Sequence, residues 1–434
     1  MDKVKAGVEL LIDPDNPGEL VTDRKLQTAL RGECLRLANA LSDRRERFPG
    51  SQPVSLLEQY MPDLAKHDWL VCEKSDGVRY LLMIYKVRFQ VQDPPKSWMK
   101  YLKGKTGTCF FVNRKFEFRS VPELDAYLGE ELLSRMDMSL LDGELVRDKV
   151  FDLVEQEEDP NAELIEDENG LPIQPPPVVR HVGYQTTFLI FDTLNVRGRY
   201  VGNLNLYDRL RVAQNEVLFC IRLSFMNRGM PPNPPCCLVL KSMYSKSDVG
   251  FVLDCILPES LPHENDGLIF TRVDKPYKPY TCEDILKWKP IHLNSVDFEV
   301  QVRHAKGDDG NNEMRYCDLY YADRGTPVPY GHIYIDGEDQ RMLLDKYRGR
   351  NIIIECCQLE DWPQYKANLR QHQSWHEATK EMGPGWKFHR VREDKSMANN
   401  VTTLKNTLRS IQANITPERL KQELGGPGPS SSHR

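Results

Sequence analysis

The run Lys74-Ser75-Asp76-Gly77 places a lysine immediately before a tight-turn sequence. A lysine amine is a strong nucleophile when it is neutral, and burial or nearby cations favour that form. The Asp-Gly pair would make a turn that aims the lysine into a cleft. Because a pattern of four residues also occurs by chance, the run taken alone more often marks a hairpin turn with an exposed lysine.

Carboxylates at two later positions could bind a divalent cation. Asp142-Gly143-Glu144 and Asp266-Gly267 each place acidic groups on a predicted strand or at its end. Hard cations such as Mg²⁺ prefer carboxylate and water oxygens as ligands. Each run alone is more typical of a solvated surface, so the two indicate a metal site only together with other motifs.

Two basic clusters could neutralise phosphate oxygens. The sequence LKWK at 286–289 places Lys287 and Lys289 on one face of a predicted strand, because successive side chains alternate. Arg390-Val391-Arg392, followed by Asp394-Lys395, forms a second cluster later in the chain. Cationic groups of this kind stabilise the charge on a transferring phosphoryl group.

Short strands punctuated by Gly, Pro, Asp or Asn are predicted to position these residues. Those before residue 290 are predicted at 69–73, 78–85, 108–113, 140–146, 187–192, 267–272 and 285–289. A helix is predicted between Leu26 and Leu41, with Thr22 or Asp23 as its N-cap and Pro49-Gly50 beyond its end. Residues 152–180 form one long acidic and proline-rich insertion.

The pattern changes after Pro290. Five further strands are predicted at 296–303, 316–321, 331–335, 352–358 and 387–392. Short strands with little helix between them fit a small barrel, of which the OB-fold is a common form. An amphipathic helix is predicted from Thr403 to Ile415, and a last short helix begins at Thr416-Pro417 and ends at Gly425. Residues 425–434 are expected to be disordered.

Composition limits the class of protein. The 434 residues suggest two or three domains. The 11 cysteines include no CxxC pair, which argues against a disulfide scaffold or a zinc ribbon. We see no signal peptide and no apolar run longer than residues 81–85, so a soluble protein of a reducing compartment is expected, without membrane association.

The charge is concentrated in the insertion. The formal net charge is −6, and residues 152–168 hold nine acidic residues and no basic ones, so the remaining chain sums to +3. A chain of this balance does not bind nucleic acid through bulk basicity. Any nucleic-acid site is therefore expected to be a local groove, and the acidic run a solvated insertion.

Seven short motifs follow one another along the chain. They are Lys74-x-Asp76-Gly77, Asn113-Arg114, Asp142-Gly143-Glu144, FLIFD at 188–192, DGLI at 266–269, LKWKP at 286–290 and Arg392-x-Asp394-Lys395. This series resembles that of the covalent nucleotidyltransferases, which comprise mRNA capping guanylyltransferases and ATP- or NAD-dependent ligases. FPGSQPVS at 48–55, HENDGLIFTR at 263–272 and W-x-F-x-R-x-R-x-D-K at 386–395 are similar to the capping guanylyltransferases, above all to their stand-alone subunits.

The resemblance implies an α+β fold. A nucleotidyltransferase domain over residues 1–290 would place antiparallel sheets around a nucleotide cleft. An OB-fold β-barrel domain with C-terminal helices would follow over 291–424. The cleft would close on GTP, exclude water during the transfer, and reopen for RNA.

The resemblance also implies roles for single residues. Lys74 would attack the α-phosphate of GTP, release pyrophosphate and carry GMP on Nζ. Lys289 would bind phosphate and stabilise the transition state, and Arg392 and Lys395 would act in catalysis at the pyrophosphate. Glu144 and Asp266 would bind the metal. The residues that would bind the substrate are Arg79, Arg114, Phe191, Lys287 and Asp394. Within the substrate set, Arg114 would contact the sugar and Phe191 would stack near guanine. The metal would be Mg²⁺ or Mn²⁺.

Partners are implied in the same way. GMP would pass from Lys74 to a 5′-diphosphate RNA end to form the GpppN cap. The phosphorylated C-terminal tail of RNA polymerase II and a separate RNA 5′-triphosphatase subunit would bind the protein, which would act in the nucleus.

Two alternatives remain open at this level. An ATP-dependent polynucleotide ligase would use the same motif series, because the choice of nucleobase depends on few pocket contacts. A non-catalytic RNA or polymerase adaptor would keep only the fold. His372 and His376 are four residues apart, but no third ligand is evident, so we expect no zinc site there.

Overall fold

The computed structural model of the chain describes residues 12–41, 47–88, 108–154, 178–229, 233–301, 316–334, 337–347, 349–358, 386–393 and 395–425. The chain divides into two compact units. The first takes its described residues from 12–54, 68–265 and 269–285, and the second from 55–67, 266–268 and 286–425. The predicted boundary at residue 290 stays a prediction.

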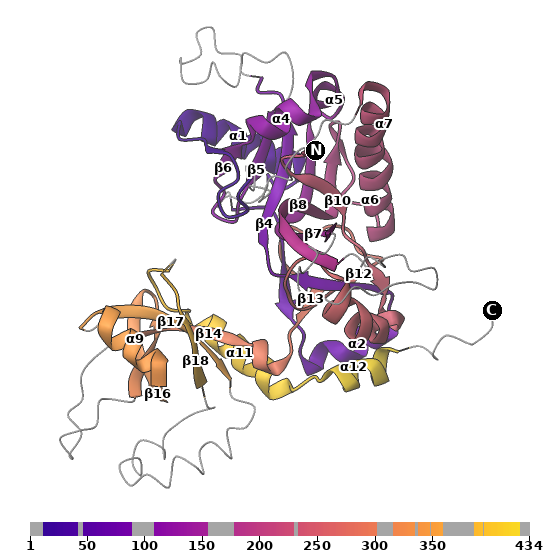
Figure 1. Cartoon of the computed structure of the whole chain (residues 1–434). Helices are drawn as coiled ribbons and strands as arrows, with labels where there is room; N and C mark the ends of the chain where they lie inside the picture. Colours follow the sequence, from indigo (N-terminus) through magenta and orange to yellow (C-terminus); the bar gives the residue numbers. More distant parts are fainter. Residues whose placement is uncertain are drawn as a thin grey trace, which may run out of the picture. The chain divides into compact units, whose positions relative to one another are not determined.

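An eight-stranded sheet forms the centre of the first unit (Figure 1). Its strands run in the order β1-β6-β5-β4-β7-β8-β10, and β9 pairs with β8. They are β1 (Glu19–Leu20), β4 (Val78–Tyr85), β5 (Thr108–Val112), β6 (Phe118–Ser120), β7 (Ser139–Val154), β8 (Val178–Val196), β9 (Arg199–Tyr200) and β10 (Cys237–Leu240). Neighbours are antiparallel except β8 and β10, which are parallel.

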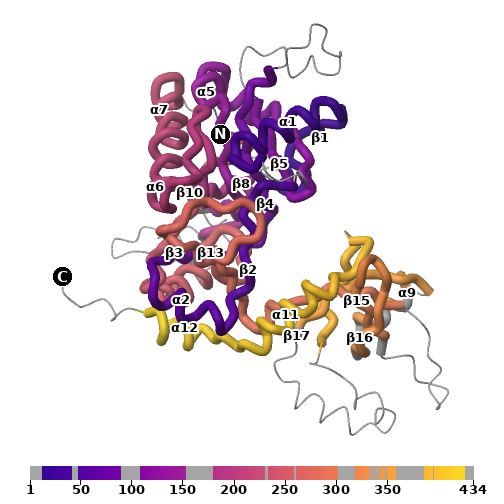
Figure 2. The backbone as a smooth tube through the Cα atoms, turned by 180° about the vertical axis from the view of Figure 1, so that it is seen from behind, coloured from indigo at the N-terminus to yellow at the C-terminus, as the bar shows by residue number. Residues whose placement is uncertain are grey.

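Helices cover both faces of this sheet. On one face, Tyr80, Leu82 and Ile84 of β4 join a core with α4, α5, α6 and α7. On the other face, the alternate residues Leu81 and Met83 pack in a core with α1. Figure 2 shows α6 and α7 beside β8 and β10, and α1 beside β5. Because both faces are covered, β4 is apolar from Tyr80 to Tyr85 instead of alternating.

The helices of the first unit differ from the sequence prediction in extent and number. They are α1 (Arg24–Leu37), α4 (Pro122–Leu128), α5 (Glu130–Arg135), α6 (Leu206–Val212), α7 (Phe219–Arg228) and the single turn α8 (Val249–Phe251), with π-helical turns at Ala213–Leu218 and Val252–Ser260. Asp23 caps α1 as predicted, accepting from the backbone amides of Lys25 and Leu26, both at 3.0 Å. The helix ends at Leu37, four residues before the predicted end, because Asn39 adopts a left-handed conformation with φ 53°.

The lysine motif belongs to a five-stranded sheet with the order β11-β3-β12-β13-β2. These strands are β2 (Ser51–Ser55), β3 (Trp69–Ser75), β11 (Tyr244–Ser245), β12 (Asn265–Arg272) and β13 (Tyr280–Trp288). The predicted strands at 69–73, 267–272 and 285–289 are thereby confirmed, each with a shift at its ends.

The acidic insertion is shorter than predicted. Strand β7 continues to Val154 and β8 starts at Val178, where an excursion over 152–180 was expected. The two strands pair residue by residue up to Val154 and Val178. Residues 155–177 lie outside the described residues, as do His372 and His376.

The second unit contains the predicted barrel strands. They are β14 (Ser295–Gln301), β15 (Tyr316–Asp323), β16 (Thr326–Tyr334), β17 (Asn351–Gln358) and β18 (Trp386–Val391), in the order β16-β15-β14-β17-β18. All neighbours are antiparallel, and β16 also contacts β18, as five strands closing into an OB-fold require. Val296, Phe298 and Val300 of β14 face the core. The α+β fold class is confirmed.

The described residues of the second unit include four helices. They are α2 (Met61–Lys66), α9 (Gly337–Tyr347), α11 (Val401–Ala413) and α12 (Pro417–Leu424), with single 3-10 turns at Glu58–Tyr60 and Ile291–Leu293. The predicted cap of α12 is confirmed, because Thr416 Oγ1 accepts from the amide of Arg419 at 3.2 Å. Helix α9 between β16 and β17 was not predicted. Among the described residues, no helix has the length and apolar character needed to cross a bilayer.

Candidate active site

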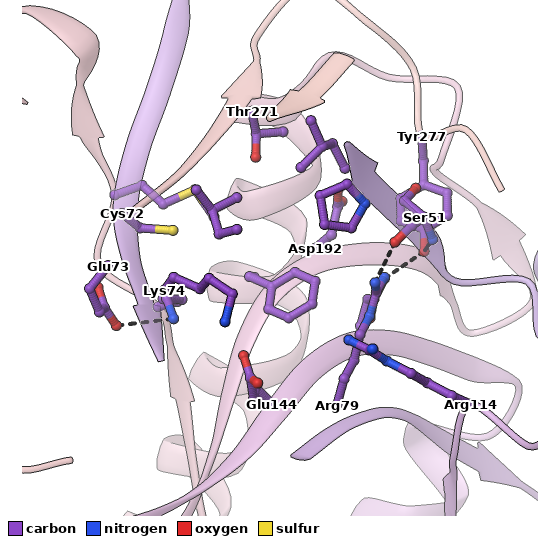
Figure 3. Close-up of a pocket in the computed structure, with 17 residues that line it drawn as sticks. Ser51, Cys72, Glu73, Lys74, Arg79, Arg114, Glu144, Asp192, Thr271 and Tyr277 are labelled. Atoms are coloured by element: carbon purple, nitrogen blue, oxygen red, sulfur yellow. Dashed lines mark hydrogen bonds and ion pairs between the residues drawn. The ribbon is translucent and has the colours of Figure 1, made fainter. Parts of the chain in front are cut away.

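A cavity of about 110 Å³ opens in the first unit beside the lysine motif. Five residues predicted from the sequence line it: Lys74 of β3, Arg79 of β4, Arg114 after β5, Glu144 of β7 and Phe191 of β8. Figure 3 shows Lys74 at one end of the cavity, and Arg79 and Arg114 at the other. Residues separated by more than 100 positions in the sequence are thus collected around one space.

The turn after β3 determines where Lys74 lies. A Cβ atom on Gly77 would be 2.4 Å from the carbonyl oxygen of Leu145 on β7, so only glycine allows this approach. The amide of Asp76 donates to the carbonyl of Glu264 at 2.8 Å. The turn is therefore held against β7, and Lys74 is partly buried in the cavity wall, not exposed as a simple hairpin lysine would be.

Arg79 is fixed by a buried ion pair. Its Nε lies 3.0 Å from Asp142 Oδ1 and its Nη2 lies 2.6 Å from Oδ2. It also donates to the carbonyl of Ser51, and the hydroxyl of Tyr277 donates to Asp142 Oδ2 at 2.5 Å. The Asp142 carboxylate raises the pKa of Arg79 against the effect of burial. Arg79 therefore presents a charged, immobile guanidinium to the cavity, 5.3 Å from the Phe191 ring.

Glu144 is the second carboxylate of the DGE motif, and it lines the cavity together with Asp142. Burial raises its pKa, and the cations of Lys241, Lys74, Arg79 and Arg114 act in the opposite direction. A further cation would stabilise the ionised form of this carboxylate, because burial penalises that form. A divalent cation bound here would supply that charge.

The other carboxylates of the cavity already hold cations. Asp142 pairs with Arg79, Asp192 pairs with Arg209 at 2.6 Å, and Glu73 pairs with Lys241 at 3.0 Å. Within the described ranges, no group of three His, Cys, Asp or Glu side chains is arranged to hold a metal ion. Mg²⁺ often takes only one or two protein carboxylates and completes its shell with water and phosphate.

Lys241 is a cavity residue that the sequence analysis missed. It follows β10, and its ammonium lies 2.6 Å from Ser75 Oγ as well as 3.0 Å from Glu73. The carboxylates raise its pKa although burial lowers it. The only local signal was a lysine directly after the apolar run LVL, which is too weak to be read without the fold.

Asp266 and Lys289 form an ion pair in the second unit, with 2.5 Å between Oδ2 and Nζ. Gly267 has φ 143°, and a Cβ there would lie 2.1 Å from the carbonyl oxygen of Trp288. Only glycine lets β12 approach β13 this closely, which places Asp266 beside Lys289. Lys287 and Lys289 line a polar cavity of about 160 Å³.

Arg392 and Lys395 share one carboxylate in the second unit. Arg392 Nη1 lies 3.1 Å from Asp297 Oδ1, and Lys395 contacts Oδ2 of the same residue. Asp297 is 4% exposed, and the sequence analysis did not single it out. Asp394 lies outside the described residues. Asp297 of β14 thus brings the two cations of the last motif together.

Comparison with known proteins assigns the family. Residues 18–165 and 178–291 match the model described as mRNA capping enzyme, catalytic domain, and residues 293–421 match mRNA capping enzyme, C-terminal domain. The chain belongs to the mRNA capping enzyme family. The resemblance stated from the motifs is therefore confirmed, together with the activity and enzyme class it implied: an mRNA guanylyltransferase, which is a nucleotidyltransferase and uses GTP.

Relatives in this family share about a quarter of their residues with the chain. The mRNA-capping enzyme subunit alpha of Schizosaccharomyces pombe is 25% identical over 90% of this chain and 83% of its own length. That of Saccharomyces cerevisiae is 27% identical over 96% of this chain and 87% of its own. The mRNA-capping enzyme of Danio rerio is 26% identical, and the chain spans only 57% of it.

A solved structure of the ligase class is also similar, at a low level. The ligase domain of M. tuberculosis LigD covers 81% of this chain and 96% of its own at 14% identity, with a TM-score of 0.31. Membership of the capping enzyme family does not favour the ligase alternative, and a family guanylyltransferase acts on RNA in mRNA processing.

Proposed function

We propose that this guanylyltransferase transfers GMP in two steps through a covalent intermediate on Lys74. In the first step the Nζ lone pair attacks the α-phosphorus of GTP, an N–P bond forms, and the P–O bond to the β-phosphate breaks to release pyrophosphate. In the second step an oxygen of a 5′-diphosphate RNA end attacks the same phosphorus, and the N–P bond breaks as the GpppN cap forms. The presence of Lys74, Arg79, Arg114 and Glu144 in one cavity carries the proposal.

The charges around the cavity support phosphoryl chemistry. Transfer at phosphorus needs in-line geometry and neutralisation of charge more than proton transfer. Arg79 and Arg114 supply positive charge at the end of the cavity opposite Lys74. We assign Arg114 to the sugar and Arg79 to a supporting position, because its guanidinium is already bound to Asp142.

The nucleobase would lie against Phe191. The ring stands beside the Arg79 guanidinium, and Met243 and Ile269 add apolar surface to the same cavity. A planar base buried between such side chains loses its contact with water, which favours stacking. Guanine in this position would leave its α-phosphate directed toward Lys74.

Mg²⁺ or Mn²⁺ would bind through Glu144, with Asp266 as the second proposed carboxylate. A bound cation would neutralise phosphate oxygens during the transfer. Because Asp266 is paired with Lys289, binding would require that pair to open. Glu144 lines the cavity, and burial penalises its charged form, so it is the primary ligand in this proposal.

The remaining basic residues would bind phosphates. We assign Lys287 and Lys289 to the α-phosphate, and Arg392, Asp394 and Lys395 to the leaving pyrophosphate. Arg392 and Lys395 contact Asp297, so a pyrophosphate would compete with that carboxylate for both cations. We further propose that the enzyme acts in the nucleus and binds a separate RNA 5′-triphosphatase and the phosphorylated tail of RNA polymerase II.

A label-transfer gel tests the chemical proposal. Purified protein is incubated with Mg²⁺ or Mn²⁺ and with α-labelled GTP or ATP in parallel. A labelled 50 kDa band with GTP alone, stable to base and labile to acid, is expected for a lysyl phosphoramidate. Labelling with ATP alone would support the ligase alternative, and no label from folded protein would support the adaptor alternative.

Two variants make the test specific to Lys74. Lys74→Arg should fold normally and form no adduct, because the arginine guanidinium stays protonated and is not a nucleophile. Lys149→Arg is a matched control, since Lys149 is an exposed lysine on β7 that pairs with Glu264. Adduct at normal levels in Lys74→Arg would refute the assignment. The polymerase proposal is tested separately: the protein should be retained on a phosphorylated peptide of the RNA polymerase II tail and not on the unphosphorylated peptide.

A further inference from the structure

A buried cluster of charged side chains surrounds the two neighbours of Lys74 on β3. Glu73 and Ser75 are 3% and 1% exposed. His263 Nε2 lies 3.2 Å from Ser75 Oγ and 3.5 Å from Glu73 Oε1, and its Nδ1 lies 2.7 Å from Asp148 Oδ1. The ammonium of Lys241 also contacts Glu73 at 3.0 Å and Ser75 Oγ at 2.6 Å. Both residues that flank the nucleophile are therefore held by side chains.

The members of this cluster come from four separate segments of the first unit. His263 precedes β12, and its segment is tied to β7 because the amide of Lys149 donates to the carbonyl of Pro262 at 2.7 Å. Lys241 is tied to β8 because its amide donates to the carbonyl of Ile190 at 2.8 Å. The cluster thus connects β3 to both β7 and β8, the strands that carry Glu144 and Phe191.

The charges of the cluster balance only when His263 is protonated. Glu73 and Asp148 supply two negative charges, and Lys241 and the His263 imidazolium supply two positive ones. Burial lowers the pKa of His263, but its bonds to Asp148 and Glu73 outweigh that effect and raise the pKa to about 9. Buried charges are tolerated when they are paired, so loss of this proton would leave one carboxylate without a cation.

Other titratable groups also neighbour the cluster. Glu144 and Cys72 act on Lys241 from the cavity, and burial raises the pKa of both. The thiols of Cys236 and Cys237 on β10 lie near Asp148, and burial raises the pKa of each, so both stay neutral. Lys149 on β7 and Glu264 beside His263 form their own exposed pair at 2.7 Å. The imidazolium is therefore the group that faces Asp148 and Glu73 together.

We propose that His263, with Lys241, is a positioning residue for the nucleophile: it holds Glu73 and Ser75, and thereby fixes the backbone at Lys74 and the direction of its amine. The inference rests on the proposed role of Lys74. His263 does not line the nucleotide cavity, so it acts through β3 and not by touching the nucleotide. A displacement of a reacting group by about 1 Å can cost about 10²-fold in rate.

Single-turnover formation of the GMP adduct in the full chain tests this inference. His263→Gln keeps hydrogen-bonding groups but cannot carry the charge. We expect its rate to fall roughly tenfold to 10²-fold, with the GTP concentration for half-maximal rate unchanged. Lys149→Gln, which removes a neighbouring exposed ammonium, should match the wild type. Equal rates in His263→Gln and wild type, or a change in GTP affinity alone, would overturn the inference.

The pH profile of the wild type gives a second measurement that needs no variant. Adduct formation should fall on the alkaline side as pH passes about 9, when His263 loses its proton, and His263→Gln should lack this decline. A wild-type rate that keeps rising through that range would overturn the inference, even if the variant failed to fold. Absence of any adduct from wild type would instead refute the proposed function of Lys74.

Discussion

Replacing Arg79 by methionine should lower the free energy of unfolding of the first unit by about 3–5 kcal/mol. Arg79 contacts both carboxylate oxygens of Asp142, and the two side chains are 6% and 0% exposed. Methionine fills a similar volume but leaves Asp142 with the hydroxyl of Tyr277 as its side-chain partner. Removing one member of a buried ion pair typically costs about 3–5 kcal/mol, because the other charge stays buried.

The penalty should depend on pH in a defined direction. Burial already raises the pKa of Asp142 although Arg79 lowers it, and loss of Arg79 should raise the pKa further. A carboxyl group whose folded pKa exceeds its unfolded pKa favours the folded state when it is protonated, and loses that contribution as pH rises. The Arg79→Met variant should therefore be closer to the wild type at pH 5 than at pH 8.

A double-mutant cycle separates the ion pair from the packing of the side chains. Asp142→Leu leaves Arg79 buried without its carboxylate and should cost a similar amount. Arg79→Met/Asp142→Leu removes both charges, so we expect it to cost clearly less than the two single changes together. Urea denaturation followed by circular dichroism at pH 5 and pH 8 measures all three variants.

Arg135→Met provides the matched control. Arg135 also forms a 2.6 Å ion pair, with Glu131, but the side chains are 61% and 78% exposed. Exposed pairs contribute at most about 1 kcal/mol. If Arg79→Met costs no more than Arg135→Met, or if the double variant costs the full sum of the singles, the buried pair does not stabilise the fold as argued.

Three further outcomes follow from the contacts described. The pKa of His263 is raised from 6.5 to about 9, so its protonation should contribute at most about 3 kcal/mol to the stability of the folded state. This contribution should be complete below pH 6.5 and lost as pH rises through 9. Thermal melts of wild type and His263→Gln across this pH range measure the difference. Gly267→Ala should lower the melting temperature, because its Cβ would lie 2.1 Å from the Trp288 carbonyl at a φ of 143°, whereas Gly32→Ala on the exposed face of α1 should not lower it. Asp297→Asn should destabilise the second unit by about 1–3 kcal/mol in urea, since it removes the charge that Arg392 and Lys395 share, and an unchanged midpoint would contradict this.

Local sequence patterns determined much of the fold. The apolar runs at β3, β4, β12 and β14 were read correctly, because strand periodicity depends only on neighbours along the chain. The caps at Asp23 and Thr416 were read correctly for the same reason, since each accepts a hydrogen bond from an amide within three residues. The order of the motifs along the chain likewise indicated the family without reference to the fold.

Tertiary structure decided which charges meet. The ion-pair partner of Arg79 is Asp142, which lies 63 positions away and reaches it only because β4 pairs with β7. Lys241 and His263 were not read as site residues at all, since nothing near them in sequence marks their contacts with Ser75, 166 and 188 positions away. A residue's type and local spacing specify what chemistry it can do, whereas strand pairing specifies which partners surround it and so how it is charged.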